Sequence, residues 1–263
     1  MSPPIIDTWP AAEAACARLR AHRLLALDME GAPLETHTSL LQLAVSPQEI
    51  YIFDVQTLGQ ALFDAEHLLP ILSDPSTLKL CYDCRGDGSA LFHQHGVRAY
   101  GLYDLQIAYT SLRIMTPSAL QLEPRAVPDA FLKGLHCAVA HLLPPDEARA
   151  FAQRKREWKR EWRTASTRLL QRPLADDALV YAAADVEHLF AMHRAWSPFF
   201  ANAALVAATD ARMLKATSSA AGGDSDDSDD ASASSSKALI DFPLVPPLVV
   251  SMSWRHRPNL KRI

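Results

Sequence analysis

Apolar and polar residues follow two different periods along this chain, and the changes between them mark a series of strands and helices. Branched apolar residues form four short extended segments, at 24–31, 39–45, 49–55 and 77–83. Such runs, bounded by turn-forming residues, are typical of β-strands. The joints between the first three segments are short and polar, so we expect these strands to pair as antiparallel hairpins.

Between and after these segments the apolar residues recur every three or four positions, as on one face of a helix. This period predicts helices at 12–22, 58–72 and 87–95, the last of them ended by Gly96. A further short strand is expected to run directly into a helix over 100–114. Strands and helices therefore alternate, which indicates an α/β protein.

The strongest helical pattern covers 172–196. Pro173 stands at its start and acidic residues fall in its first turns, as helix N-termini favour. The region before it, 116–172, is helical in places and interrupted by prolines. The apolar stripe of the late helix consists of Leu179, Ala182, Val186, Leu189 and Phe190.

The composition indicates one globular domain followed by a different kind of sequence. The chain has 263 residues, of which 49% are hydrophobic, enough to bury a substantial core in residues 1–214. Residues 215–238 are rich in Ser, Asp and Gly, so we expect a disordered acidic linker there. The tail at 239–263 is apolar and then basic; it would either dock on the domain or bind a protein partner. The net charge of −4 includes the acids of the linker and identifies no partner class.

Several classes of protein are disfavoured. No apolar run approaches the roughly 20 residues that a membrane-spanning helix needs, and the first residues lack the pattern of a secretory signal. An intracellular location, nuclear or cytoplasmic, is therefore expected. The four cysteines fit that location as free thiols, and the lone C-x-x-C of Cys81 and Cys84 has no second pair with which to bind zinc.

Two acids in the first extended segment, "LLALDMEG", raise a chemical question. Side chains alternate in a strand, so Asp28 and Glu30 point to the same face. Two like charges at this spacing repel each other unless a cation lies between them, and oxygen ligands suit Mg²⁺ or Mn²⁺. The alternative is an edge strand whose polar face meets water.

Two later segments supply further groups of the same kind. Asp87 stands at the start of a predicted helix that follows a strand, and Tyr181 and Asp185 lie one turn apart on the late helix. If four such acids converge, they can hold two metal ions about 3.5–4 Å apart, which suits displacement at a phosphodiester.

These three stretches, in this order, resemble the motifs of the DEDDy 3′–5′ exonucleases. The similarity is to the ribonuclease D-like branch, with the Werner-type exonuclease domains and the small 3′–5′ exonuclease domain-containing proteins. "LDMEG" resembles motif I, "LKLCYDCRGDGSALFHQHG" motif II and "RPLADDALVYAAADVEHL" motif III, while "YDLQIAY" resembles the segment between the last two. The resemblance spans roughly residues 20–197. It implies a ribonuclease H-like fold, with a mixed central sheet flanked by helices.

The resemblance also implies a role for each motif residue. Asp28 would bridge two Mg²⁺ or Mn²⁺ ions, Glu30 and Asp185 would ligate the ion that activates water, and Asp87 would support the other. Tyr181 would orient the attacking water. The implied reaction is hydrolysis from a single-stranded or frayed 3′ end of RNA or DNA, releasing nucleoside 5′-monophosphates. The sequence departs from the family at Tyr82, where many relatives have His, and at Leu169, where Trp is frequent.

The segment "RKREWKREWR" at 154–163 has two interpretations. Its two Trp residues, at i and i+4, are typical of an amphipathic helix that buries them and exposes its charges. Alternatively, the segment forms a basic surface that contacts phosphates while an aromatic ring stacks on a base. The candidates for nucleic-acid binding are Arg154, Lys155, Arg156 and Lys159.

Two functions remain open at this point, and a third, an endonuclease on the same fold, is disfavoured because the Tyr-x-x-x-Asp helix favours trimming from an end. The first is the exonuclease, favoured because all four acids and the tyrosine of the motifs are present. The second is a catalytically silent exonuclease-like domain that binds nucleic acid or a protein as an adaptor. Asp83 and Asp104 are additional acids near the motifs, and we interpret Asp104 as structural. The sequence does not indicate an oligomeric state.

Overall fold

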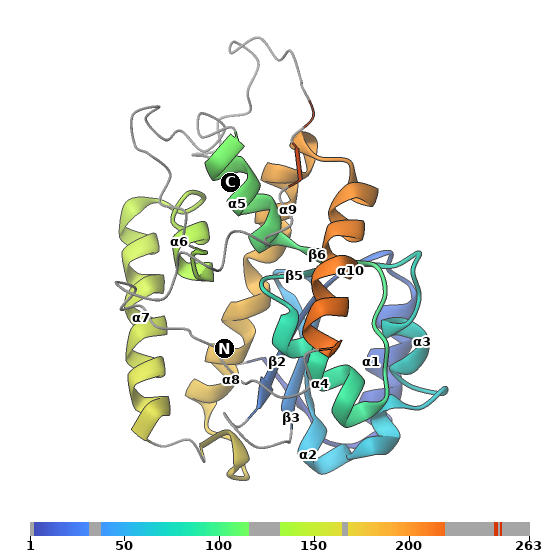
Figure 1. Ribbon diagram of the computed structural model, residues 1–263. Helices are drawn as coiled ribbons and strands as arrows, with labels where there is room; N and C mark the ends of the chain where they lie inside the picture. The colour runs from blue at the N-terminus through green and yellow to red at the C-terminus, as the bar shows by residue number, and fades with distance from the viewer. Residues whose placement is uncertain are drawn as a thin grey trace.

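The computed structural model describes residues 3–31, 38–115, 132–164 and 168–218, together with Val245, Pro246 and Leu248. These residues form an α/β domain with a six-stranded mixed sheet in the order β1-β4-β3-β2-β5-β6 (Figure 1). The fold class predicted from the sequence, a mixed central sheet flanked by helices, is confirmed. The strands are β1 (Ile5–Ile6), β2 (Leu24–Gly31), β3 (Thr38–Ser46), β4 (Glu49–Asp54), β5 (Leu78–Cys81) and β6 (Leu102–Asp104).

The pairing of the strands follows the predicted hairpins. β3 is antiparallel to both β2 and β4, which confirms the expectation for the first three long strands. β5 is parallel to β2 and to β6. Helices connect β4 to β5 and β5 to β6, and return the chain to the same end of the sheet each time. β2 therefore lies inside the sheet, between β3 and β5, and is not an edge strand.

Helices cover both faces of the sheet (Figure 1). The described helices, with 3₁₀ turns marked η, are α1 (Trp9–Arg20), α2 (Val55–Leu58), η1 (Gln60–Phe63), α3 (Leu69–Leu72), α4 (Arg85–His95), α5 (Leu105–Met115), α6 (Leu135–Val139), α7 (Pro145–Thr164), η3 (Arg168–Leu170), α8 (Asp176–Glu187), α9 (Leu189–Trp196), η4 (Ser197–Phe199) and α10 (Asn202–Ser218). Among these residues no helix is both long and apolar enough to cross a membrane.

The alternation along β2 decides which helices meet which side chains. Leu25 and Leu27 point to the face covered by α1, α2 and α3, where they join one apolar cluster. Ala26 points to the opposite face and packs in a second cluster with residues of α5 and α9. By the same alternation, Asp28 and Glu30 point to this second face. α8 also lies on that face and packs on β2, β3 and β4.

Two predicted helices are interrupted. The single helix expected at 58–72 is replaced by three shorter elements: the last residue of α2, then η1, then α3. Gly59 ends α2 with a φ of 70°, in a region that disfavours other residues. The helix expected at 172–196 begins only at Asp176 and divides into α8 and α9 at His188. Pro173 lies three residues before Asp176, outside the helix, so the prediction that this proline starts the helix was wrong.

The boundary of the predicted linker and the tail are partly described. α10 continues to Ser218, so the first residues assigned to the linker at 215 are helical, and residues 219–238 lie outside the described part. In the tail, Val245 is buried and its N–H donates to Oγ of Ser111 at 3.0 Å. The N–H of Leu248 donates to the carbonyl of Phe199 at 2.6 Å. At these residues the tail docks on the domain.

Candidate active site

Three acids from two distant parts of the sequence come together on the sheet face beneath α8. β2 contributes Asp28 and Glu30, and α8 contributes Asp185 one turn after Tyr181. One carboxylate oxygen of each acid lies within 4.8 Å of the others, so the three groups can surround one cation. Asp28 and Glu30 are half-buried and Asp185 is buried. Because β2 is an interior strand, a solvent-facing edge strand does not explain its acids.

Burial and neighbouring acids raise the affinity of Asp28 and Glu30 for protons. Burial is the largest cause that raises the pKa of Asp28 well above its usual value, and the charges of Asp87, Asp185 and Glu30 raise it further. Burial followed by the charge of Asp185 does the same for the pKa of Glu30. Each proton or cation that enters this cluster therefore relieves repulsion, which is the electrostatic condition for binding a divalent metal.

Asp87 approaches the cluster from another side. It lies in the first turn of α4, directly after β5, and it is half-buried. It is not one of the three acids within 4.8 Å of each other, but its charge raises the pKa of Asp28. Burial, and then the charges of Asp83 and Asp104, raise the pKa of Asp87 itself, while a backbone hydrogen bond from Met29 lowers it. Asp87 thus interacts electrostatically with Asp28 without belonging to the group of three acids.

A cation of the protein already faces the three acids. Lys155 of α7 forms an ion pair with Asp185, and its Nζ lies 3.9 Å from the ring centroid of Tyr181. Its charge lowers the pKa of Asp28 and of Glu30. From the sequence, Lys155 was predicted only as a candidate for nucleic-acid binding. Its ion pair with Asp185, on another helix, was not predicted.

The rest of the basic segment divides between interior and surface. Trp158 is buried, and its ring meets that of Tyr181 edge-on with the centroids 4.9 Å apart. This supports the amphipathic interpretation of the helix for one of its two tryptophans; the side chain of Trp162 lies outside the described part. Arg154 and Arg156 are exposed. The side chain of Lys159 is not among those described.

An arginine fixes the start of the third motif. Arg172 donates to Asp54 at the end of β4 through Nε at 2.5 Å and Nη2 at 2.6 Å, and to the hydroxyl of Ser39 at 3.2 Å. Burial would raise the pKa of Asp54, but the hydrogen bond from Arg172 brings it below its usual value. This bidentate pair joins the segment before α8 to the sheet and so helps to place Asp185 above β2.

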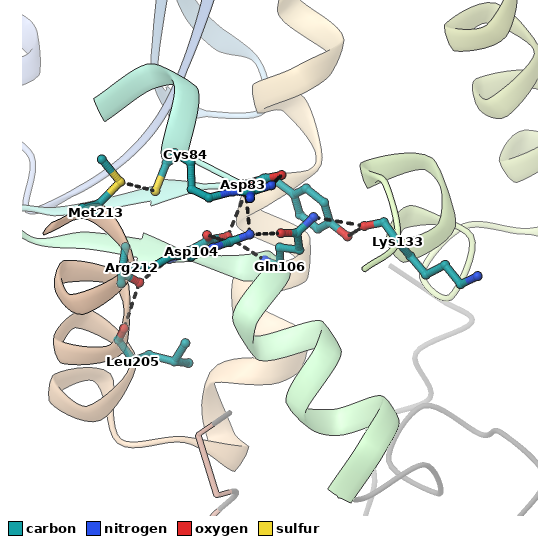
Figure 2. Close-up of polar contacts among 11 residues, drawn as sticks. Asp83, Cys84, Asp104, Gln106, Lys133, Leu205, Arg212 and Met213 are labelled. Carbon is teal, nitrogen blue, oxygen red and sulfur yellow. Dashed lines mark hydrogen bonds and ion pairs between the residues drawn. The ribbon is translucent and has the colours of Figure 1, made fainter. Parts of the chain in front are cut away.

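A second group of acids, Asp83 and Asp104, has a different character (Figure 2). Asp104 is fully buried; it accepts hydrogen bonds from the N–H groups of Asp83 and Gln106, both at 2.9 Å, and pairs with Arg212. The same guanidinium reaches Gln106 at 2.6 Å and Asp83 at 3.0 Å. Arg85 also pairs with Asp83 at 2.7 Å. The structural interpretation of Asp104 is confirmed, whereas nothing in the sequence singled out Arg212.

Tyr82 and the two cysteines of the second motif have local packing roles. The hydroxyl of Tyr82, which stands where many relatives have His, donates to the carbonyl of Lys133 at 2.7 Å. Cys81 and Cys84 are free, fully buried thiols, and burial is the largest cause that raises the pKa of Cys81. Both therefore act as small core residues, as the lone C-x-x-C predicted.

Comparison with known proteins identifies the family. A family model described as 3′–5′ exonuclease matches residues 3–197. Ribonuclease D of Nitrobacter hamburgensis is 28% identical over 188 residues, which are 70% of this chain and 41% of that protein. The piRNA biogenesis protein EXD1 of Mus musculus is 33% identical over 96 residues, 36% of this chain and 17% of the relative. The chain thus spans less than half the length of these curated relatives.

Solved structures agree on the fold. Trypanosoma brucei RNase D, solved as a complex with GMP and as a complex with RNA U12, superposes with TM-scores of 0.69 and 0.66. These matches cover 93% of this chain and 72% and 79% of those chains, at 24% identity. The fold is that of the ribonuclease H-like exonucleases, and the chain belongs to the 3′–5′ exonuclease family, in its DEDDy, ribonuclease D-like branch.

Proposed function

We propose that this protein is a metal-dependent 3′–5′ exonuclease that removes nucleoside 5′-monophosphates from single-stranded or frayed 3′ ends. The observation that carries the proposal is the convergence of Asp28, Glu30 and Asp185 within 4.8 Å, with Asp87 beside them. RNA is the first substrate to test, because ribonuclease D and the RNA-bound structure are among the matches. DNA remains the alternative substrate.

The donor set fits hard divalent cations. Carboxylate oxygens are the ligands that Mg²⁺ and Mn²⁺ prefer. Burial first, and neighbouring carboxylates second, raise the pKa values of Asp28 and Glu30, and a bound cation would oppose both effects. Asp28, Glu30 and Asp185 would hold one ion, and Asp28 with Asp87 would hold the second. When bound, two such ions would polarise the scissile phosphate and stabilise the leaving 3′ oxygen.

Residues of α7 and α8 would then act on water and substrate. The hydroxyl of Tyr181 would orient the attacking water and help to take its proton. Lys155 would exchange its ion pair with Asp185 for a contact with a phosphate oxygen of the substrate, because a divalent ion outcompetes a single ammonium for three carboxylates. Arg154, Arg156 and Lys159 would contact phosphates further along the strand.

A second candidate is a catalytically silent adaptor that binds nucleic acid. The ion pair between Lys155 and Asp185 favours it, because an internal ammonium can partly satisfy the acids with no divalent ion present. The match to a piRNA biogenesis protein is compatible with either function. The two candidates differ in one observable, the release of mononucleotides.

The decisive experiment is a time course with the full chain and 5′-labelled single-stranded RNA and DNA, in Mg²⁺, in Mn²⁺ and in EDTA. We expect a ladder that shortens from the 3′ end only with metal. Asp28→Ala should reduce the rate by about 1,000-fold or more, since metal-ion charge stabilisation supplies several kcal/mol of the barrier reduction.

A matched control is Asp176→Asn, an exposed acid on the same helix as Asp185, which should retain the wild-type rate. Wild-type activity in Asp28→Ala would exclude the metal assignment. If the folded wild-type chain cleaves neither strand but binds it, the adaptor becomes the better description.

A further inference from the structure

The C-terminal helix α10 contacts the turn that carries Asp87, although it lies beyond the segment that matches the family model. That match ends at residue 197, and α10 covers Asn202–Ser218. α10 packs beside α4 and β6 (Figure 1). Two adjacent residues of α10, Arg212 and Met213, make two different kinds of contact with the chain on either side of Asp87.

The first contact is steric. Met213 packs so closely on Gly88 that a Cβ atom at position 88 would lie 1.8 Å from its Cε and 3.0 Å from its Sδ. Its Sδ also lies 3.9 Å from the sulfur of Cys84, the residue that precedes α4 (Figure 2). The side chain of Met213 therefore fills the space under the first turn of α4. Gly88 is the residue directly after Asp87, so the thioether end of Met213 lies directly against the turn that bears the acid.

The second contact is electrostatic. Arg212 is buried, and its guanidinium joins Asp83, Asp104 and Gln106 (Figure 2). Asp83 adopts a positive φ of 59° in the turn between β5 and α4, a conformation that is uncommon for residues other than glycine. The guanidinium holds the side chain of Asp83 in this turn, while Asp104 accepts its N–H.

These contacts leave the β5–α4 turn with little freedom. On one side the turn is fixed to β6 through Asp104, and on the other the first turn of α4 rests on Met213. Arg212 links the two sides, because its guanidinium pairs with Asp104 of β6 and it is the residue directly before Met213 in α10. A carboxylate that ligates metal must be held within a few tenths of an ångström, by neighbours whose own positions are fixed.

We propose that Arg212 and Met213 are positioning residues, through which α10 places the Asp87 carboxylate toward Asp28. The proposal rests on the proposed function, because the position of Asp87 matters to catalysis only if the acids hold metal. It adds a helix outside the matched segment to the active site. It also gives Gly88 a specific role, which is to admit Met213 without a side chain of its own.

The test uses two glycines of the same helix as a matched pair. Gly88→Ala places a methyl group against Met213, whereas a Cβ atom at Gly86 meets no atom within 4 Å. Both substitutions favour a helix to the same extent, so propensity alone predicts the same effect for both. The double variant Gly88→Ala/Met213→Ala removes the clash. All variants are made in the full chain and checked for the cooperative unfolding of the wild type.

The readouts are Mn²⁺ affinity by calorimetry, and kcat and KM on single-stranded RNA. For Gly88→Ala we expect at least a tenfold loss of Mn²⁺ affinity and of kcat, with KM changed less than twofold. Gly86→Ala should match the wild type. The double variant should recover only part of the loss, because it lacks the clash but also lacks the Met213 side chain that packs against Gly88 in the wild type. A crystal structure of Gly88→Ala should show the Asp87 carboxylate displaced relative to Asp28.

Three results would overturn the positioning role. They are wild-type Mn²⁺ affinity in a folded Gly88→Ala, equal losses in the double and single variants, or an Asp87 carboxylate that has not moved in the crystal structure. Failure of the proposed function would look different. In that case the wild-type chain itself would show no metal-dependent cleavage, while the crystallographic comparison would still decide whether α10 sets the position of Asp87.

Discussion

Two groups of acids lie close together in this protein, and the fold compensates their charges in opposite ways. Asp83 and Asp104 share the guanidinium of Arg212, and Asp104 also accepts two backbone N–H groups. Asp28, Glu30 and Asp185 face the single ammonium of Lys155, among side chains that the structure describes. Both groups are rich in carboxylates. In the first, Arg212 and two backbone N–H groups oppose the burial that raises the pKa of Asp104. In the second, by contrast, the ammonium of Lys155 opposes the burial and repulsion that raise the pKa of Asp28.

The difference separates a structural use of acids from a chemical one. A buried carboxylate that meets a guanidinium and N–H donors is satisfied by the fold and has little left to offer a ligand. Three carboxylates around one ammonium remain mutually repulsive, and a fold retains such a group where an external cation completes it. The number of acids near a motif does not distinguish the two cases, whereas their partners do.

The largest expected effect on stability comes from removing the shared guanidinium. Arg212→Met leaves Asp83 and Asp104 without their common partner in the interior, and should lower the free energy of unfolding by about 3–5 kcal/mol. The matched control is Arg85→Met, which also removes a partner of Asp83, from a side chain that is 47% exposed. Exposed pairs contribute roughly 0–1 kcal/mol, so this control should unfold almost as the wild type does.

Urea unfolding of the two variants and the wild type, at the same pH and in EDTA, measures the difference. Equal losses in Arg212→Met and Arg85→Met would mean that burial does not distinguish these pairs, and the contrast between the two groups of acids would fail.

The next effect is a dependence of stability on pH that belongs to the uncompensated group. The folded chain raises the pKa of Asp28 and of Glu30, so between their usual values near pH 4 and their raised values it binds more protons than the unfolded chain. The stabilisation from these protons is complete below about pH 4 and is lost as pH rises through the raised pKa values. For each pH unit by which folding raises the pKa of such a carboxyl, the free energy of unfolding changes by about 1.4 kcal/mol across this range.

Urea unfolding in EDTA at pH 5 and pH 8 therefore should show the wild type losing stability relative to Asp28→Asn as pH rises. Mn²⁺ should abolish this loss. Asp54→Asn is the opposite control: Arg172 lowers the pKa of Asp54, so its contribution is constant from pH 5 to 8 and is lost only in acid, as pH falls through the lowered value. A flat difference for Asp28→Asn would show that its charge is compensated after all.

Local patterns in the sequence were sufficient to predict the strands β2 to β6 and the orientation of the first two acids, whereas the two-residue strand β1 was not predicted. Period-two alternation over 24–31 places Asp28 and Glu30 on one face, and the order of segments predicted the antiparallel hairpins of the mixed sheet. Asp185 was expected near them from the resemblance of its motif, and the structure brings it there. The roles of these acids, and of Asp87 and Tyr181, stay predictions.

What the sequence could not show depends on pairs that are far apart along the chain. Arg212 and Asp104 are separated by 108 residues, and no sequence pattern near either residue predicts that they pair. Lys155 belongs to a basic run whose charges look equivalent in the sequence. The structure pairs its ammonium with Asp185, and nothing in the run distinguishes this lysine from its neighbours. The break of the late helix at His188 also escaped prediction, because the apolar period continues across it.

The smallest expected effect tests whether Lys155 belongs with the acids or with the nucleic-acid surface. In EDTA, where single-stranded RNA is bound but not cleaved, each phosphate contact contributes about 0.7 to the slope of log K against log salt. Arg154→Gln/Arg156→Gln removes two exposed charges and should reduce the slope by about 1.4. Lys155→Met should change the slope by less than half of what the loss of one arginine does, because the Lys155 ammonium is held by Asp185 when no metal competes. Fluorescence anisotropy at a series of KCl concentrations measures the slopes. If Lys155→Met alters the slope as much as each arginine does, the lysine serves the phosphate backbone even without metal, and the acids are less compensated than their ion pair indicates.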